Sequence, residues 1–467
     1  MAFPATTKKV FELPELTHRL SRFVTVQDAI SCALVSKAWT EHFISVIWFK
    51  IDFDVHPRFL NLSPDIVAKH GHHIRIIVDA KTLPQVSILA NSGVNGLRDL
   101  KIETAASASQ HVRAYEIVFR NNHSLEDLNL TAINTTVSKQ DSTAHYVPVS
   151  ALIPSLGSSS PTLSKLQRLR IQNMCLTHDS LAFVLQGCPR LSQLRLSFTD
   201  VVGTPTQSFQ HAGVKVFGST LKSIFPDEPT GTSLLSYFPG LTTLSTYNYG
   251  SSHSIPSARI KDDITRYCPH LSGYHLEDST GAIVLNFLTD IANNMSEIVC
   301  LLRHISSETI TAMLLHQATL KIVKHFNFEQ DFDFEKEEIA KVGDHLQLSG
   351  RFLQLIPRCC PDLEELRLFG HEMDMDVVEQ GKWVCHDLKT LRIRIKGLDT
   401  KEKILKAIAL WRKGCWRRWR KNAGTSVAAE DEEDETDMSI EARVARHLLK
   451  FDKLWWVWLG YQTWTPI

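Results

Sequence analysis

The 467-residue sequence predicts an α/β fold: a short helical segment followed by a curved solenoid with parallel strands on its concave face and helices on its convex face. Two observations predict this fold. A short phrase of leucines recurs at near-constant intervals along residues 56–467, and residues 11–55 show helical periodicity. The apolar content of 43% and the charged content of 22% are typical of folded protein.

The recurring phrase is L-x-x-L-x-L, with other apolar residues allowed. Copies start 25 residues apart at Leu166 and Leu191, and again at Leu363 and Leu388. Leucine-rich repeats run about 20–29 residues, so the phrase predicts stacked parallel strands that bury their leucines in register. We expect clear copies to start at Leu97, Leu125, Leu166, Leu191, Leu363, Leu388 and Leu454, looser copies at Leu221, Leu241, Leu271, Met295 and Leu320, and a worn copy in IRIIV at 74–78.

Helical spacing precedes several copies of the phrase. Ile260, Ile264 and Tyr267 are spaced to share one helix face. Phe352, Leu355 and Ile356 are spaced in the same way. A proline then ends each helix because it cannot continue the hydrogen bonding. The resulting order of helix, break and strand resembles irregular leucine-rich repeats; the prolines are Pro189, Pro269 and Pro361.

The front of the chain is expected to hold a different module. Residues 1–10 are expected to be a flexible leader, and residues 11–55 a domain of three short amphipathic helices. Thr25 with Asp28, and Ser36, are expected to begin two of these helices. The apolar stripes comprise Leu16, Leu20, Phe23 and Val24, then Ile30, Ala33 and Leu34, then Trp39, Phe43, Val46 and Ile47.

This module resembles an F-box. The matching features are the Leu-Pro-Glu-Leu start at 13–16 and a run at 33–39 similar to the family's L-x-x-V-x-x-x-W ending, although Ser36-Lys37 stand where many members carry Cys-Arg. The resemblance implies docking to the Skp-type adaptor of a cullin–RING (SCF-type) ubiquitin ligase, with Trp39 supporting the box from within. The implied adaptor contacts are Leu13, Pro14, Leu20 and Val35.

The resemblance implies that the chain is a substrate-recognition subunit that performs no covalent step itself. An alternative stays open at this point, because any solenoid needs a cap on its first repeat. On that interpretation the front helices only cap the repeats, and the chain is a non-catalytic interaction scaffold.

The substrate is expected to bind the concave face. The residue between the last two apolar positions of each phrase points away from the core, because strand side chains alternate. Across eleven copies this position holds six Lys or Arg and no acidic residue. Because guanidinium forks suit carboxylate or phosphate, we expect an acidic or phosphorylated protein segment there, although such arginines also serve solubility alone. The candidate substrate contacts are the neighbouring pairs Arg170 with Arg195 and Arg367 with Arg392.

An insertion is expected between the copies at Leu388 and Leu454. A helix around Ile404, Ile408 and Trp411 should precede a disordered stretch at 420–438, and another around Ile440, Val444 and Leu448 should follow. The run WRKGCWRRWRKN at 411–422 meets an acidic run, which indicates either a self-screening solvated insertion or a stacking site for single-stranded nucleic acid. In the last copy we expect buried Leu454, Val457 and Leu459 and exposed Trp456 and Trp458.

Other chemistry finds little support in the sequence. The 51 basic and 51 acidic residues balance, so we expect no membrane partner and do not favour nucleic acid. Nine cysteines without a CxxC pair indicate reduced thiols in a cytoplasmic or nuclear protein, with Cys32 and at least one of Cys359 and Cys360 in the core. Nucleotide-binding, metalloprotease and hydrolase motifs are missing, so we expect no catalytic residue, cofactor or metal, and HGHH at 70–73 is expected to be a polar turn.

Overall fold

The computed structural model describes most of the chain. The described residues are 20, 23–105, 108–133, 162–197, 199–220, 224, 233–247, 257–277, 295–301, 307–326, 353–422 and 438–459. The expected leader at 1–10 and most of the expected disordered stretch, 423–437, lie outside them. The chain forms two compact units, Met1–Gly240 and Leu241–Ile467.

The first unit carries a run of parallel strands in chain order. Two helices, α3 (Val26–Ala33) and α4 (Lys37–Ile47), precede the strands. The strands are β1 (Lys50–Asp52), β2 (Ile76–Ala80), β3 (Asp99–Ala105), β4 (Asp127–Ile133), β5 (Arg168–Gln172), β7 (Gln193–Ser197) and β9 (Val216–Thr220), and a separate parallel pair is formed by β6 (Cys175–Thr177) and β8 (Asp200–Val202). The helical segments between them are η1 (Pro57–Asn61), α5 (Pro64–His70), η2 (Gly71–His73), α6 (Leu83–Asn91), α7 (Ala108–Arg120), α8 (His178–Gln186) and η4 (Leu234–Tyr237).

The second unit repeats the same design. Its parallel strands are β10 (Thr243–Tyr247), β11 (Gly273–Glu277), β12 (Glu297–Leu301), β13 (Ile322–Phe326), β14 (Glu365–Met373), β15 (Thr390–Ile395) and β16 (Trp456–Leu459). Its helices are α10 (Ser257–Tyr267), α12 (Ser307–Leu314), α14 (Leu355–Cys359), α15 (Met375–Gln380), α16 (Lys401–Asn422) and α17 (Ile440–Leu448).

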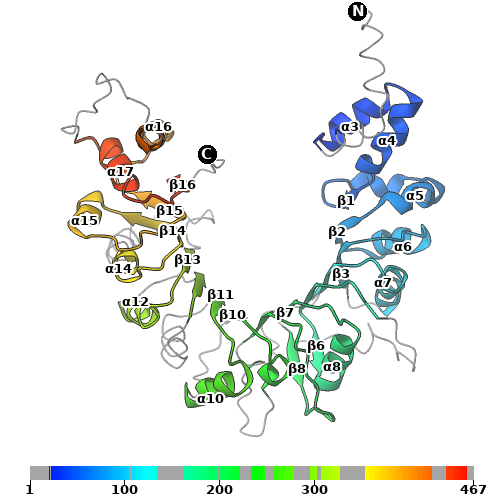
Figure 1. Cartoon of the computed structure of the whole chain (residues 1–467). Coiled ribbons are helices and arrows are strands. Elements are labelled where there is room, and N and C mark those ends of the chain that lie inside the picture. The colour runs from blue at the N-terminus through cyan, green and yellow to red at the C-terminus, as the bar shows by residue number, and fades with distance from the viewer. Residues whose placement is uncertain are drawn as a thin grey trace, which may run out of the picture. The chain divides into compact units, whose positions relative to one another are not determined.

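Within each unit, helices lie along one side of the strands. Figure 1 shows α5, α6 and α7 beside β1, β2 and β3, and α12, α14 and α15 beside β13, β14 and β15. Neighbouring parallel strands must be joined by crossover connections, and these helices provide them. The helices also bury one face of the strands. We call the other face of each unit its strand face. The protein is therefore a mixed α/β chain with a long parallel sheet, in line with a leucine-rich-repeat-like solenoid.

The leucine phrases lie in the register that their spacing predicts. Leu128 pairs with Leu169, and Leu169 with Leu194, so equivalent leucines stack strand by strand. The first residue of each described copy is buried, because its side chain enters the layer between strands and helices. These buried residues are Leu97, Leu125, Leu166, Leu191, Leu241, Leu271, Met295, Leu320, Leu363, Leu388 and Leu454.

Polar side chains at helix ends join some neighbouring repeats. The buried Asn121, just after α7, accepts a hydrogen bond of 2.9 Å from the Leu97 amide of the preceding repeat. It also donates to the carbonyls of Val94 and Ile117. His316, just after α12, uses Nδ1 to accept from the Met295 amide at 3.4 Å. Buried backbone groups that strands leave unpaired are thereby satisfied.

Two strand positions differ from those that the leucine phrase predicts. The copy expected at Leu221 starts outside the described residues, and β9, which begins at Val216 after the fully buried Val214, was not predicted. The worn copy at 74–78 corresponds to β2, but β2 is preceded by another strand. This first strand, β1, lies inside the segment 11–55, and Lys50 pairs with Ile76. The sheet therefore begins within the segment that was expected to be helical.

The expected helix faces hold in part. Ile260 and Ile264 of α10 are buried, as their spacing predicts. In α14 Ile356 is buried, but Leu355 is exposed and Leu353 takes the inner position. The difference arises because α14 is only five residues long, so a spacing that assumes a longer regular helix fails.

The segment between β15 and β16 contains both expected helices. Ile404, Ile408 and Trp411 of α16 are buried, as are Val444 and Leu448 of α17. Helix α16 continues through the basic run to Asn422. Among the helices of the described residues, none combines the length and apolarity needed to cross a bilayer.

Candidate interaction surfaces

The first candidate surface is a cluster of exposed apolar side chains on α3 and its flanks. Phe23 is 86% exposed, Leu34 is 83% exposed and Val35 is 67% exposed. Val26 and Ile30 of α3 are also exposed. We call these five residues the helical patch. Single exposed leucines are ordinary on protein surfaces, but a cluster of this kind marks a contact site.

Local hydrogen bonds fix the helices that carry the patch. The Thr25 hydroxyl accepts from the Asp28 amide, and the Asp28 carboxylate accepts from the Thr25 amide, which makes a capping box. Ser36 caps α4 through the Trp39 amide. The expected helix starts are therefore confirmed. Because Ala29 and Phe43 occupy the inner positions, Leu34 points outward instead of joining the expected apolar stripe.

The residues implied by the F-box resemblance fall into two groups. Leu13 and Pro14 lie outside the described residues. Leu20 and Val35 are exposed, so both side chains are accessible to a partner. Trp39 is half-buried, with its ring 5.6 Å from that of the buried Phe43, in a supporting position.

The second candidate surface is the strand face of the first unit. Lys101, Asn129, Arg170 and Arg195 form one row across β3, β4, β5 and β7, as the sequence predicts, and Gly218 continues the row on β9. Arg170 and Arg195 are therefore direct neighbours. Arg170 is exposed and Arg195 is half-buried. Gly218, the neighbour of Arg195 on β9, is buried.

Acidic residues accompany the basic row on this face. Lys101 pairs with Asp79, and Arg168 Nε lies 2.6 Å from Asp127 Oδ2. Burial raises the pKa of Asp99, with a further rise from Asp127 and an opposing effect from Arg168 and Arg170. The acids gather on β2, β3 and β4, and the arginines gather on β5 and β7. The face is thus divided into an acidic part and a basic part.

The third candidate surface is the strand face of the second unit, where charges alternate. His275 Nε2 lies 3.2 Å from Glu297 Oε1, and Lys324 Nζ lies 3.4 Å from Glu365 Oε1. The hydrogen bond from His275 lowers the pKa of Glu297 against the opposing effect of burial. Glu365 also pairs with Arg367. This ladder places a carboxylate within ion-pair distance of each of these three side chains.

Arg367 and Arg392 are neighbours on β14 and β15, but both are already engaged. The Arg367 guanidinium lies 5.1 Å from the centroid of the Trp456 ring, and that of Arg392 lies 3.4 Å from the centroid of the Trp458 ring. Cation–π contacts of this kind stabilise an arginine without an anion. Trp458, expected to be exposed, is 9% exposed because Arg392 and Trp456 cover it, and Trp455 is exposed instead.

Sequence reasoning missed the acids that flank the basic row. Asp99 stands two residues before Lys101, and Glu365 two residues before Arg367. Glu297 stands two residues before Val299, which pairs with Lys324. Each acid therefore lies on the same face of its strand as the middle residue of the phrase. Strand alternation applied to the whole strand, and not only to its middle position, would have found them.

The described residues contain no group of three or more His, Cys, Asp or Glu side chains placed to hold a metal ion. The ring centroids of His72 and His73 lie 3.8 Å apart with the ring planes tilted by 42°, in the turn η2. Cys360 is buried, as expected for one of its pair, whereas Cys32 is half-buried rather than in the core. Burial raises the pKa of Cys360 to about 12, so this thiol stays protonated.

Comparisons with known proteins identify no family for this chain. No protein-family model matches the chain, and no curated protein matches it. Among solved structures, the chain is similar to the leucine-rich-repeat ectodomain of the plant membrane receptor kinase GASSHO1/SCHENGEN3 from Arabidopsis thaliana, solved in complex with CASPARIAN STRIP INTEGRITY FACTOR 2. The identity is 12% and the TM-score 0.24, over 75% of this chain and 42% of that one.

Proposed function

We propose that this protein is a non-catalytic substrate receptor of a cullin–RING ubiquitin ligase. In this proposal the helical patch docks a Skp-type adaptor, and the strand face of the first unit binds a protein substrate. The mechanism is effective concentration, because one chain that holds both adaptor and substrate keeps the substrate near the ligase.

The observation that carries this proposal is the exposure of the helical patch. Phe23, Leu34 and Val35 leave most of their apolar surface in water. Covering such surface gains about 25 cal/mol per Å², so a partner that buries the patch gains several kcal/mol. The F-box resemblance of the same segment identifies the class of partner, and Leu20 and Val35 are available for the implied contacts.

On the substrate side, Arg170 and Arg195 support an acidic partner. Their positive charges stand side by side on β5 and β7. An anionic segment would reduce the repulsion between the two guanidinium groups. The pair Arg367 and Arg392 is a weaker candidate, because Glu365, Trp456 and Trp458 already contact it.

A second function, the plain scaffold with a helical cap, is favoured by the contacts behind the patch. Trp48, directly after α4, stacks on His70 at 4.9 Å and packs edge-on against Phe59 at 5.9 Å. The front helices are thus continuous with the core of the first repeats. In the scaffold interpretation they shield this core and bind no adaptor.

Binding of the purified full chain to a Skp-type adaptor, measured by calorimetry, separates the two functions. We expect Leu34→Asp with Val35→Asp to weaken binding at least tenfold while thermal unfolding stays unchanged, because both side chains are exposed. The matched control is Val202→Asp, which changes an exposed valine on β8. If the unaltered chain does not bind the adaptor, the ligase proposal is wrong and the scaffold stands.

A further inference from the structure

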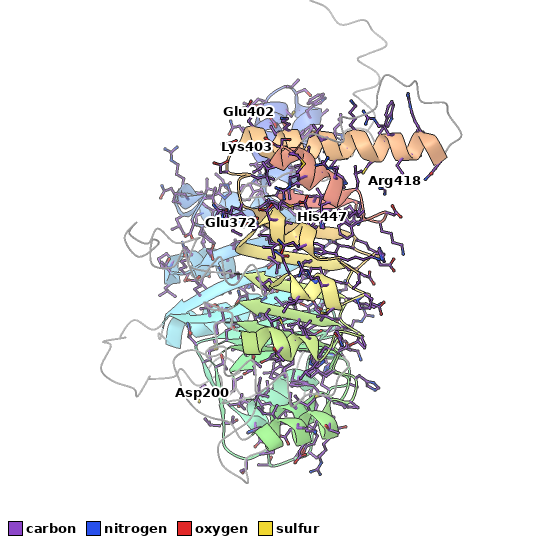
Figure 2. All side chains as sticks on the ribbon, turned by 90° about the vertical axis from the view of Figure 1, so that its left-hand side faces the viewer. Asp200, Glu372, Glu402, Lys403, Arg418 and His447 are labelled. Atoms are coloured by element: carbon purple, nitrogen blue, oxygen red, sulfur yellow. The ribbon has the colours of Figure 1, made fainter. Side chains whose placement is uncertain are left out.

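The C-terminal half of α16 has a surface that the proposed function does not use. Figure 2 shows Glu402 and Lys403 near the start of this helix and Arg418 toward its far end, which extends past α17. Trp416 is 47% exposed and Trp419 is 66% exposed. We call the segment 412–421 the basic arm, because it contains Arg412, Lys413, Arg417, Arg418, Arg420 and Lys421 and no acidic residue.

The basic arm is held in place from its inner side. A Cβ atom at Gly414 would stand 2.5 Å from Leu449 Cδ1, so glycine allows α16 and α17 to approach. Beyond it, Arg418 donates to the Leu449 carbonyl and pairs with Asp452. Buried Trp411 anchors the preceding turn. The outer side of the arm is therefore displayed on a fixed helix.

Exposed apolar and basic side chains share one side of α16. Leu405, Arg412, Trp416 and Trp419 follow helical spacing along one stripe, about a quarter turn around the helix from the buried residues, and all four are exposed. A helix face that only met water would carry charges there without two tryptophans. Cations suit the C-terminal end of a helix dipole, which accounts for the arginines but not for the tryptophans.

Charge and geometry together point to an anionic lipid surface, and we propose that the basic arm binds anionic bilayers peripherally. Helices with Lys and Arg beside exposed Trp lie in the headgroup region of such bilayers, where each basic residue strengthens binding by about fivefold. The balanced net charge of the chain argues against a membrane partner only on average, because binding follows local charge. The acidic run at 430–437 follows the arm in the sequence, so the proposal requires this run to lie away from the lipid surface.

Two other partner classes fit the surface less well. The tryptophans expose on the order of 250 Å² together, far below the roughly 800 Å² that each partner buries in a standard protein interface. Single-stranded nucleic acid stacks its bases on open aromatic faces within a groove. Here Arg420 covers one face of Trp416 at 3.6 Å from the ring centroid, and the tryptophans stand on a convex helix. A lipid surface requires neither a large complementary area nor a groove.

The test is sedimentation of the full chain with phosphatidylcholine vesicles that contain phosphatidylserine, compared with phosphatidylcholine alone. We expect binding only to the anionic vesicles, with a blue shift of tryptophan fluorescence. Binding should be lost at an ionic strength of about 1 M, where the screening length falls to about 3 Å. Equal binding to both vesicle types, or no binding to either, would overturn the proposal.

Matched variants assign the binding to the arm. Trp416→Ala with Trp419→Ala should weaken binding about tenfold or more, and Arg412→Ala with Arg420→Ala about twentyfold. The controls are Trp455→Ala and Lys382→Ala, which remove an exposed tryptophan and an exposed lysine elsewhere in the same unit. Losses in the controls equal to those in the arm overturn the assignment. If a polythymidine oligonucleotide binds more tightly than the anionic vesicles, and the same variants weaken that binding, the ligand of the arm is nucleic acid and the lipid proposal is wrong.

Discussion

At the residue scale, His447 shows how the fold of the second unit depends on a neutral side chain. Its ring lies 4.7 Å from that of Trp383 and 5.5 Å from that of Phe451, and the side chain is buried. Burial lowers the pKa of His447 to about 4, with a further lowering from Lys450 and an opposing effect from Glu379.

This lowered pKa predicts acid sensitivity of the second unit. The unfolded chain binds a proton near pH 6.5 and the folded chain only near pH 4, so stability falls as pH drops between these values and levels off below. The loss from this residue is at most about 3 kcal/mol. Urea unfolding at about pH 7 and about pH 4.5 should show a smaller pH dependence in His447→Leu, whereas the exposed-site control His386→Leu should keep it. An unchanged dependence in His447→Leu contradicts the prediction.

At the scale of elements, the repeats are joined by single side chains as well as by leucines. Asn121 joins α7 to the preceding repeat through two hydrogen bonds, with the Leu97 amide and the Val94 carbonyl, and makes a third with the Ile117 carbonyl of α7 itself. Asn121 is fully buried, so water does not replace these bonds when the side chain is lost.

Asn121→Ala is therefore expected to destabilise the first unit by about 2–3 kcal/mol, because it leaves a buried amide unpaired. Hydrogen exchange of the peptide that contains Leu97 should speed up first. Asn122→Ala is the matched control, since the neighbouring asparagine is only half-buried. Equal effects of both variants would show that the joint contributes nothing.

The elements also show what the sequence can predict. The leucine phrases predict strand positions because equivalent residues of neighbouring parallel strands point to the same face of the sheet. Leu169, Leu194 and Leu391 all lie in the expected register. Strand β9, which begins at Val216, was not predicted because Val214 and Phe217 match the leucine phrase less well than Leu221 does. A pattern of single residues cannot weigh such alternatives, since the decision rests on packing with neighbouring repeats.

The candidate sites show the same limit. Alternation places Trp458 on the strand face in the row of Arg392, as predicted, but exposure also depends on what lies beside it. Arg392 comes from the neighbouring strand β15, which the local pattern of β16 does not contain, and it covers the ring together with Trp456 of β16 itself. Orientation can thus be predicted from a strand's own sequence, whereas burial on an open face cannot.

At the scale of the whole molecule, the two strand faces use similar residues for different ends. In the first unit Arg170 and Arg195 stand beside Gly218, with the acids gathered on other strands. In the second unit Glu297, Glu365, Trp456 and Trp458 are interleaved with the cations. Interleaved charges stabilise the sheet locally, whereas separated charges leave a field that a partner can meet.

The contrast predicts opposite effects of removing the two arginine pairs. Arg170→Ala with Arg195→Ala should weaken binding of a polyglutamate peptide, measured by fluorescence anisotropy, by about tenfold. Arg367→Ala with Arg392→Ala should leave peptide binding within about twofold but lower the free energy of unfolding by about 1–2 kcal/mol, because it uncovers Trp458 and removes one of the partners of Glu365. The two double variants delete identical groups from the same positions of the repeat, so each serves as the control for the other. Equal losses of peptide binding would mean that charge number, and not its arrangement, determines affinity, and the first unit would then have no distinct role.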